Sequence, residues 1–153
     1  MWVVISMGMG LTAATVVIHA VGTTLWIQRL RGHEAREKKS LSGANWRLLA
    51  LLIQTSLVIL SLHMLEVVVW AAAFWFAPQV PQLDSFEDAV YFSSVTFTTL
   101  GYGDIVLQQK WRLLAGMEAM VGIIHFGWST ALIFSAVQRL IRLHLVQSGD
   151  HQS

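Results

Sequence analysis

The stretch that decides the fold is TTLGYGD at residues 98–104, which carries glycine at two alternate positions. A short apolar segment precedes it, and SFED at residues 85–88 has the pattern of a helix capping box. These features predict a helix over residues 85–98, about half the length that a membrane crossing needs. Residues 79–111 are too few and too polar for a full crossing, so we expect a short helix that enters the membrane and an extended strand that leaves it. Non-helical backbone at that depth must be buried in protein or line a water-filled path, which predicts an oligomer around an axis.

Long runs with very few charges lie on either side of this stretch. Residues 1–28 contain no Asp, Glu, Lys or Arg, and at about 1.5 Å per residue they reach roughly 40 Å, more than the roughly 30 Å of a hydrocarbon core. The run that follows Arg47 is interrupted only by Glu66, and the run that follows Arg112 is interrupted only by Glu118. The fold class is therefore an all-α membrane protein with three transmembrane helices.

The composition agrees with a bilayer protein. Hydrophobic residues make up 55% of the 153 residues and charged residues only 12%, which argues against a soluble globule and against disorder. A net charge of +1 gives no field that would recruit nucleic acid. The absence of cysteine excludes disulfides, thiolate metal sites and a cysteine nucleophile.

The basic residues set the orientation. Eight of the ten Lys and Arg residues fall between the first two runs or after the third, so the positive-inside rule places that loop and the C-terminus in the cytoplasm and the N-terminus outside. A cleaved signal peptide is disfavoured for the first run because its start is uncharged and its apolar stretch is too long. We expect tryptophans to mark the two membrane interfaces: Trp2, Trp70, Trp75 and Trp111 outside, Trp26 and Trp46 inside.

The TTLGYGD stretch resembles the selectivity filter of the potassium-channel family. The resemblance covers residues 48–143, which it divides into an outer helix 48–78, a pore helix 85–98, a filter 99–103 and an inner helix 112–143. The remaining parts are an initial transmembrane helix 1–28, a basic cytoplasmic linker 29–47 and a short cytoplasmic tail 144–153.

The resemblance implies a homotetramer in the inner membrane, surrounded by lipid, that conducts K⁺ passively and needs no enzyme activity and no organic cofactor. Four chains would bind K⁺ through the carbonyls of Thr99, Leu100, Gly101 and Tyr102 and the Thr99 hydroxyl. Gly101 and Gly103 would supply the left-handed backbone angles that aim successive carbonyls at one axis. Leu100 departs from the commoner valine, which affects packing behind the filter more than the choice of ion.

The same resemblance assigns residues that support the filter. They are Thr98, Asp104, Tyr91, Phe92 and Glu118. Tyr91 and Phe92 fall where a cuff around Tyr102 would be. Phe92 stands where some relatives have a tryptophan donor, which leaves Tyr91 as the partner of Asp104. Glu118 is similar to an acid of inward-rectifier-like bacterial channels, and we interpret it as a hydrogen-bond acceptor behind the pore helix.

One face of the inner helix would line the cavity and the gate. Its residues follow helical spacing and are Ile123, Phe126, Thr130, Phe134 and Gln138. Phe134 is either a hydrophobic constriction or an ordinary packing residue. Gly122 and Gly127 serve either close helix packing or a hinge.

Ionisable residues inside the membrane are costly and therefore point to function. Glu66 and Glu118 are such residues, and we interpret His125 as an interhelical histidine with a hydrogen-bond partner. A membrane metalloenzyme is a distant second class, because a His63 and Glu66 pair and a Glu118 and His125 pair only partly match a di-metal pattern. The chain could also be a non-selective cation channel or a non-conducting accessory subunit. No span carries a ladder of arginines, so a voltage sensor is not expected.

Overall fold

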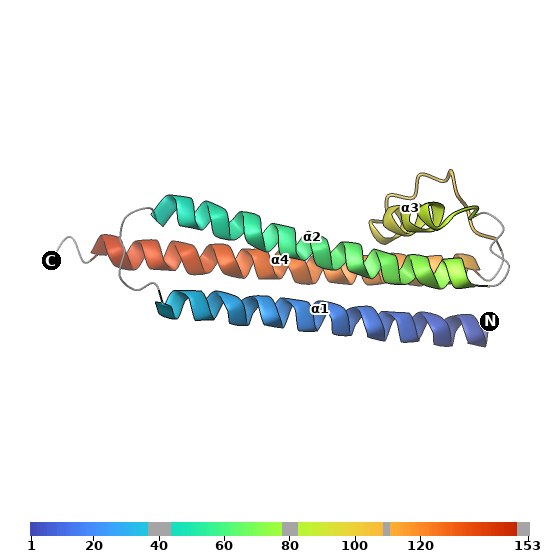
Figure 1. The fold of residues 1–153 in the computed structure, drawn as a ribbon, viewed down its shortest axis with the longest axis horizontal. Coiled ribbons are helices and arrows are strands. Elements are labelled where there is room, and N and C mark those ends of the chain that lie inside the picture. The colour runs from blue at the N-terminus through green and yellow to red at the C-terminus, as the bar shows by residue number, and fades with distance from the viewer. Residues whose placement is uncertain (37–43, 78–82, 109–110, 150–153) are drawn as a thin grey trace.

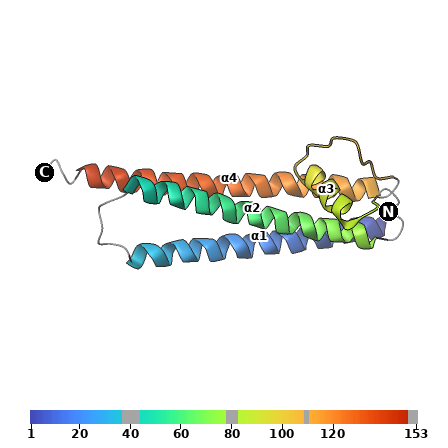
Figure 2. The same cartoon turned by 45° about the horizontal axis from the view of Figure 1, so that its top comes forward.

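The computed structural model describes residues 1–36, 44–77, 83–108 and 111–149, and these contain helices and no strand. The elements are α1 (Trp2–Arg36), α2 (Ala44–Phe76), α3 (Phe86–Phe97) and α4 (Trp111–Gly149). The three long helices run alongside one another, and the short α3 packs on α2 and α4 near one end (Figure 1). The N-terminus lies at the α3 end and the last turns of α4 lie at the opposite end, which a second view confirms (Figure 2).

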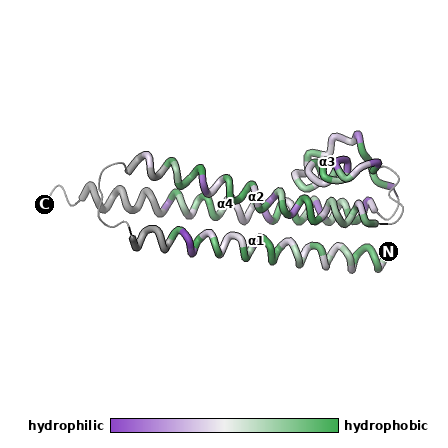
Figure 3. The backbone as a smooth tube through the Cα atoms, in the orientation of Figure 1, coloured by the Kyte–Doolittle hydropathy of each residue, from purple (hydrophilic) through white to green (hydrophobic). Residues whose placement is uncertain are grey.

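The long helices are built for an apolar surrounding. Three spans are long and apolar enough to cross a membrane: Trp2–Leu30, Leu49–Phe76 and Trp111–Gln138. Hydrophobic residues predominate along them (Figure 3). Large apolar side chains such as Val17, Leu57 and Ile124 are exposed, whereas two acids and three histidines are buried among the helices: Glu66, Glu118, His19, His63 and His125. This distribution is the reverse of a water-soluble core and fits a protein whose outer face meets lipid.

Helix α3 begins with the capping box that the sequence predicts. The Asp88 backbone N–H donates to Ser85 Oγ at 3.1 Å, and the Ser85 backbone N–H donates to Asp88 Oδ2 at 2.9 Å. Glu87 and Asp88 place negative charge in the first turn, where it interacts favourably with the helix dipole. The helix ends at Phe97, with Thr98 as its C-cap. At 12 residues it is about 18 Å long.

An aromatic core fixes α3 against α2. The Phe92 ring meets the Phe74 ring edge-on at 5.2 Å, and Trp70 packs 6.5 Å from Phe74. Trp70 is fully buried and Trp111 nearly so, which contradicts the expectation that both mark the outer membrane interface. Both indoles belong to the core because α3 packs over this end of α2 and α4. Trp2, in contrast, is exposed.

The helices are longer than the charge-poor runs. Helix α1 continues to Arg36, through residues that we expected to be linker, and α4 continues to Gly149, into the expected tail. Charges mark where a span leaves the bilayer, but Arg, Leu, Glu and Ala are good helix formers and allow a helix to continue in water. Helix α2 begins at Ala44, so the last four residues of the expected linker are helical as well. Residues 37–43 of the linker and residues 150–153 of the tail lie outside the described residues.

Close backbone contact explains Gly122. A Cβ atom there would overlap the Phe97 carbonyl oxygen, so α4 and the end of α3 touch through their backbones. Gly127 has open space around it. Both glycines lie within the continuous helix α4. The structure thus gives Gly122 the packing role that the sequence left open.

We predict that Gly122→Ala destabilises the fold by about 1–3 kcal/mol, because the methyl group overlaps backbone that cannot rotate away. The matched control is Gly116→Ala on the same helix, where an added Cβ would meet nothing within 4 Å. This control is expected to be neutral or to stabilise by up to about 1 kcal/mol. Thermal unfolding of the purified full-length variants in detergent measures both. Equal effects of the two substitutions would contradict the contact.

Candidate functional site

The TLGYG segment, residues 99–103, leaves α3 in a regularly alternating backbone. Every second residue is left-handed: Thr99 has φ 59°, Gly101 has φ 55° and Gly103 has φ 81°. The N–H groups of Leu100 and Gly101 both donate to the Val95 carbonyl, at 2.9 and 3.3 Å, which ends the helix and turns the chain. The sequence predicted left-handed angles at the two glycines but not at Thr99. A β-branched residue in this region is strained by about 1–3 kcal/mol, which is typical of functional sites.

The whole TTLGYGD stretch is exposed within one chain. The Leu100 and Tyr102 side chains are 56% and 69% exposed. No ring contact joins Tyr102 to Phe92 in the part of the chain that is described, because Phe92 is buried against α2. The expected position of Phe92 in a cuff around Tyr102 is therefore not seen within one chain.

The Tyr91 hydroxyl donates a hydrogen bond of 2.7 Å to Asp104 Oδ2. This is the partner that the sequence left for Asp104. The bond lowers the pKa of Asp104 and raises the pKa of Tyr91, because it stabilises the carboxylate and uses the phenol proton. It ties the segment beyond Gly103 back to the middle of α3. The Thr98 hydroxyl donates to the Ser94 carbonyl at 2.7 Å and so stays on the last turn of the helix.

A second link joins α3 to α4 on the buried side. Ser93 Oγ donates to Glu118 Oε1, and both side chains are fully buried. The other carboxyl oxygen, Oε2, is buried without a hydrogen-bond partner. Glu118 therefore lies behind α3, in the position in which the sequence predicted an acceptor.

Five residues of α4 predicted to line a cavity are exposed in the single chain: Ile123, Phe126, Thr130, Phe134 and Gln138. We call them the exposed α4 face. Ile123 and Phe134 are about equally exposed, at 61% and 60%, whereas Phe126 is 37% exposed because its ring also contacts Phe97 at 5.7 Å. This face and the TLGYG segment are thus both exposed within one chain.

A family model described as an ion channel matches residues 48–139, more than half of the chain. The protein belongs to this ion channel family. With its three apolar helices, it is a multi-pass membrane protein. The match includes almost all of α2, all of α3 with the TLGYG segment, and α4 as far as residue 139. No curated protein and no solved structure matches the chain significantly.

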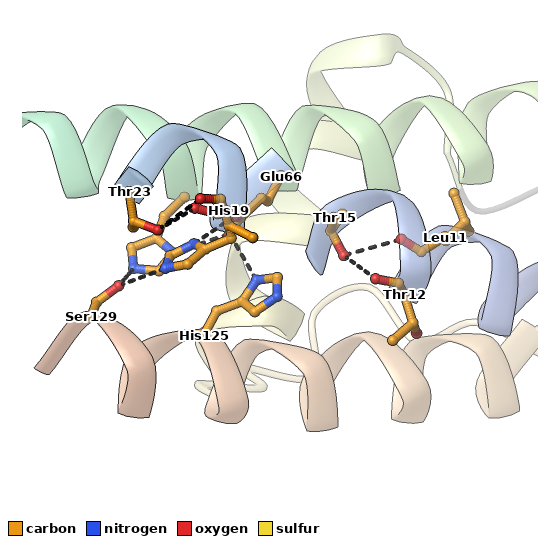
Figure 4. Close-up of polar contacts among 10 residues, drawn as sticks. Leu11, Thr12, Thr15, His19, Thr23, Glu66, His125 and Ser129 are labelled. Atoms are coloured by element: carbon orange, nitrogen blue, oxygen red, sulfur yellow. Dashed lines mark hydrogen bonds and ion pairs between the residues drawn. The ribbon is translucent and has the colours of Figure 1, made fainter. Parts of the chain in front are cut away.

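Helix α1 lies outside the matched region of the channel and joins it through a buried polar cluster (Figure 4). The two oxygens of Glu66 meet three imidazoles: His19 Nδ1 at 2.7 Å, His125 Nδ1 at 2.9 Å and His63 Nδ1 at 3.1 Å. Ser129 Oγ lies 3.3 Å from His19 Nε2 and 3.1 Å from His63 Nε2. The cluster thus connects α1, α2 and α4.

Sequence reasoning missed His19 and did not pair His125 with Glu66. A usable signal was present, since Thr15, His19 and Thr23 recur every four residues in an otherwise apolar helix and all three are buried. His125 is interhelical as expected, but its Nε2 atom is buried without a partner. Of the two pairs considered for a di-metal site, His63 and Glu66 are in contact at 3.1 Å, but Glu118 and His125 are not, because Glu118 bonds to Ser93 and His125 bonds to Glu66.

We predict that Tyr91→Phe raises the pKa of Asp104 toward its ordinary value, because the hydrogen bond that stabilises the carboxylate is lost. The folded-state pKa of Asp104 is depressed, so the bond contributes stability above the ordinary aspartate pKa and loses it as the pH falls through the folded-state value. Carbon NMR titration of the Asp104 carboxyl measures the shift, and Asp104→Asn assigns the resonance. An unchanged titration would contradict the contact.

We also predict that Ser93→Ala destabilises the channel by about 1–3 kcal/mol, because it leaves the buried Glu118 carboxyl without its hydrogen-bond donor. Ser94→Ala is the matched control, since the Ser94 hydroxyl bonds only to the Val90 carbonyl of its own helix. Its effect should stay within about 0.5 kcal/mol. Thermal unfolding in detergent distinguishes the two, and a larger loss for the control would refute the role of Ser93.

Proposed function

We propose that the protein is a potassium-selective channel in which four identical chains conduct K⁺ passively through their TLGYG segments. The observation that carries the proposal is the left-handed backbone at Thr99, Gly101 and Gly103, directly after a half-length helix, in a member of an ion channel family. Alternation of this kind turns successive carbonyl groups toward the same side of the chain. Conduction makes and breaks no covalent bond, so the proposal requires neither catalysis nor an organic cofactor.

In the proposed filter, carbonyl oxygens bind the K⁺ ion. K⁺ must exchange its hydration shell for other oxygens, and the carbonyls of Thr99, Leu100, Gly101 and Tyr102 with the Thr99 hydroxyl provide them in each of four chains. The substitution of leucine for valine leaves the carbonyl unchanged. The C-terminal end of α3 immediately precedes this segment, and its partial negative charge favours a cation there.

The proposed tetramer would cover what one chain leaves exposed. The TLGYG segment and the exposed α4 face are largely uncovered within the chain, yet irregular backbone inside a bilayer needs protein or a water-filled path beside it. Around a four-fold axis the TLGYG segments would form the filter and the exposed α4 faces would line the cavity. Phe134 would then lie at a narrow point near the cytoplasm. The lipid-facing surface is then the remaining apolar side of the long helices.

The N-terminus and the α3 end lie together, as the orientation with an external N-terminus requires. The basic residues between α1 and α2 support a cytoplasmic position for the opposite end. We therefore place the protein in the inner membrane with its C-terminus in the cytoplasm.

The test is K⁺ flux through the purified full-length protein in liposomes. We expect flux that Ba²⁺ blocks and a reversal potential that follows the K⁺ gradient rather than the Na⁺ gradient. Gly101→Ala should reduce flux at least tenfold, because an L-residue costs about 1–2 kcal/mol at this angle in every chain. Gly116→Ala, in open space on α4, is the matched control and should conduct like the wild type.

Each failure points to a different function. Equal Na⁺ and K⁺ permeation would make the protein a non-selective cation channel. Absence of flux from a correctly folded homomer would favour an accessory subunit. Full conduction by Gly101→Ala would show that the TLGYG segment is not the filter. Native mass spectrometry of the same preparation tests the tetramer.

A further inference from the structure

The buried cluster contains a closed cycle of hydrogen-bonding groups, which we call the Glu66 ring. Its four members follow in order: Glu66 contacts His19, His19 contacts Ser129, Ser129 contacts His63, and His63 contacts Glu66. His19 belongs to α1, His63 and Glu66 to α2, and Ser129 to α4. All four are buried, with His63 the most exposed at 7%. His125 joins from outside the cycle through its Nδ1 atom.

The cycle needs a definite number of protons. Each of its four contacts is a hydrogen bond only if one proton lies in it. A neutral imidazole brings one N–H and a serine one O–H, so His19, His63 and Ser129 supply three. The fourth must come from Glu66 as a carboxylic acid, or from one imidazole that carries protons on both nitrogens. In either form the ring has one proton more than an ionised carboxylate with neutral histidines would have.

The charge balance points the same way. With the additional proton the ring and His125 are together neutral, whereas without it they carry one negative charge inside the membrane. The groups that face the ring bring no compensating cation. They are His125 and Trp128 of α4, which contact the His19 ring, and Phe97 of α3 and Phe126 of α4, which contact His63. An uncompensated charge at this depth is costly, so the neutral form is favoured.

A metal ion in place of the proton fits less well. His19, Glu66 and His125 offer ligand atoms within 4.8 Å of one another, which would suit a transition metal by donor type. However, the contacts of His19 and His125 with Glu66, at 2.7 and 2.9 Å, have hydrogen-bond lengths. Ligand atoms around a tetrahedral zinc lie roughly 3.3 Å apart. The His19 and His125 rings are also stacked, at 4.8 Å and 20°, rather than spread around a centre.

We propose that the Glu66 ring is a binding site for one proton per chain and that the bound proton closes the hydrogen-bond cycle joining α1 to the channel helices. Removal of the proton leaves one contact with two acceptors facing each other and a buried negative charge. The Glu66 ring lies beside the C-terminal end of α3. There the Phe97 side chain contacts the imidazoles of His63 and His125, with about 6 Å between ring centroids. Its protonation state therefore acts directly on the helix that precedes the TLGYG segment. Proton binding at this ring does not depend on potassium selectivity.

The test counts protons in the full-length protein in lipid bilayers near neutral pH. His33, His144 and His151 are replaced by Gln so that only the three cluster histidines remain. Nitrogen NMR of labelled histidine and carbon NMR of labelled glutamate then report which ring nitrogens and whether Glu66 carry protons. We expect the wild type to hold one proton more than neutral imidazoles and an ionised Glu66 account for.

Two variants and a control make the result specific. Ser129→Ala opens the cycle and removes the contact that only the additional proton can fill, so this variant should bind the proton less tightly and release it at a lower pH than the wild type. Ser135→Ala, whose hydroxyl bonds only to the Ala131 carbonyl on the same helix, should keep it. Glu66→Gln supplies the missing donor as an amide N–H, so it should keep the cycle and the fold without the additional proton.

Three results would overturn the proposal. The first is an ionised Glu66 beside neutral imidazoles in the wild type at neutral pH. The second is release of the proton from Ser129→Ala at the same pH as from the wild type. The third is a stoichiometric divalent metal ion, found by elemental analysis of the wild type and absent from Glu66→Gln. Because the count is made without any ion gradient, a protein that fails to conduct K⁺ still gives a decisive answer here.

Discussion

The structure depends on one constraint: backbone polar groups inside a bilayer need partners. Helices α1, α2 and α4 satisfy it within themselves. The TLGYG segment does not, because its residues leave the helical conformation and alternate between left-handed and ordinary angles. In the proposed channel this segment lies inside the bilayer, where its carbonyls are stable only beside other protein or water. Carbonyls of this kind are also what an alkali cation binds, so the proposal explains the exposed segment and the function together.

Polar contacts on both sides of α3, one exposed and one buried, hold this helix in place. Tyr91 ties the chain beyond Gly103 to the middle of the helix, and Ser93 ties the buried side of the helix to Glu118. Direct backbone contact between Phe97 and Gly122 adds a third point of attachment. The Glu66 ring then joins α1 to α2 and α4. A short helix of 12 residues has little packing area of its own, so its position depends on specific contacts of this kind.

Much of this arrangement could be predicted from residue patterns. The capping box at Ser85, the three spans and the pairing of Tyr91 with Asp104 follow from local rules or from the family resemblance, and the structure contains all of them. The positions of Trp70 and Trp111 could not be predicted, because an indole near the end of a span suits an interface equally well until another helix covers it. The positive φ angle of Thr99 was also missed, since glycine is the residue from which a sequence predicts such an angle.

The sequence by itself determined how many helices are apolar enough to span a membrane and where α3 starts. It also determined which residues follow α3 in a non-helical backbone. Charge gaps, caps and glycines act over a few neighbouring residues, so these features can be read locally. Only the tertiary structure decided that His19, His63 and His125 share the carboxylate of Glu66. These residues are up to 106 positions apart, and a lone histidine in an apolar helix carries no sign of its partner. Buried polar groups must find partners, but which partner is available depends on how the helices pack.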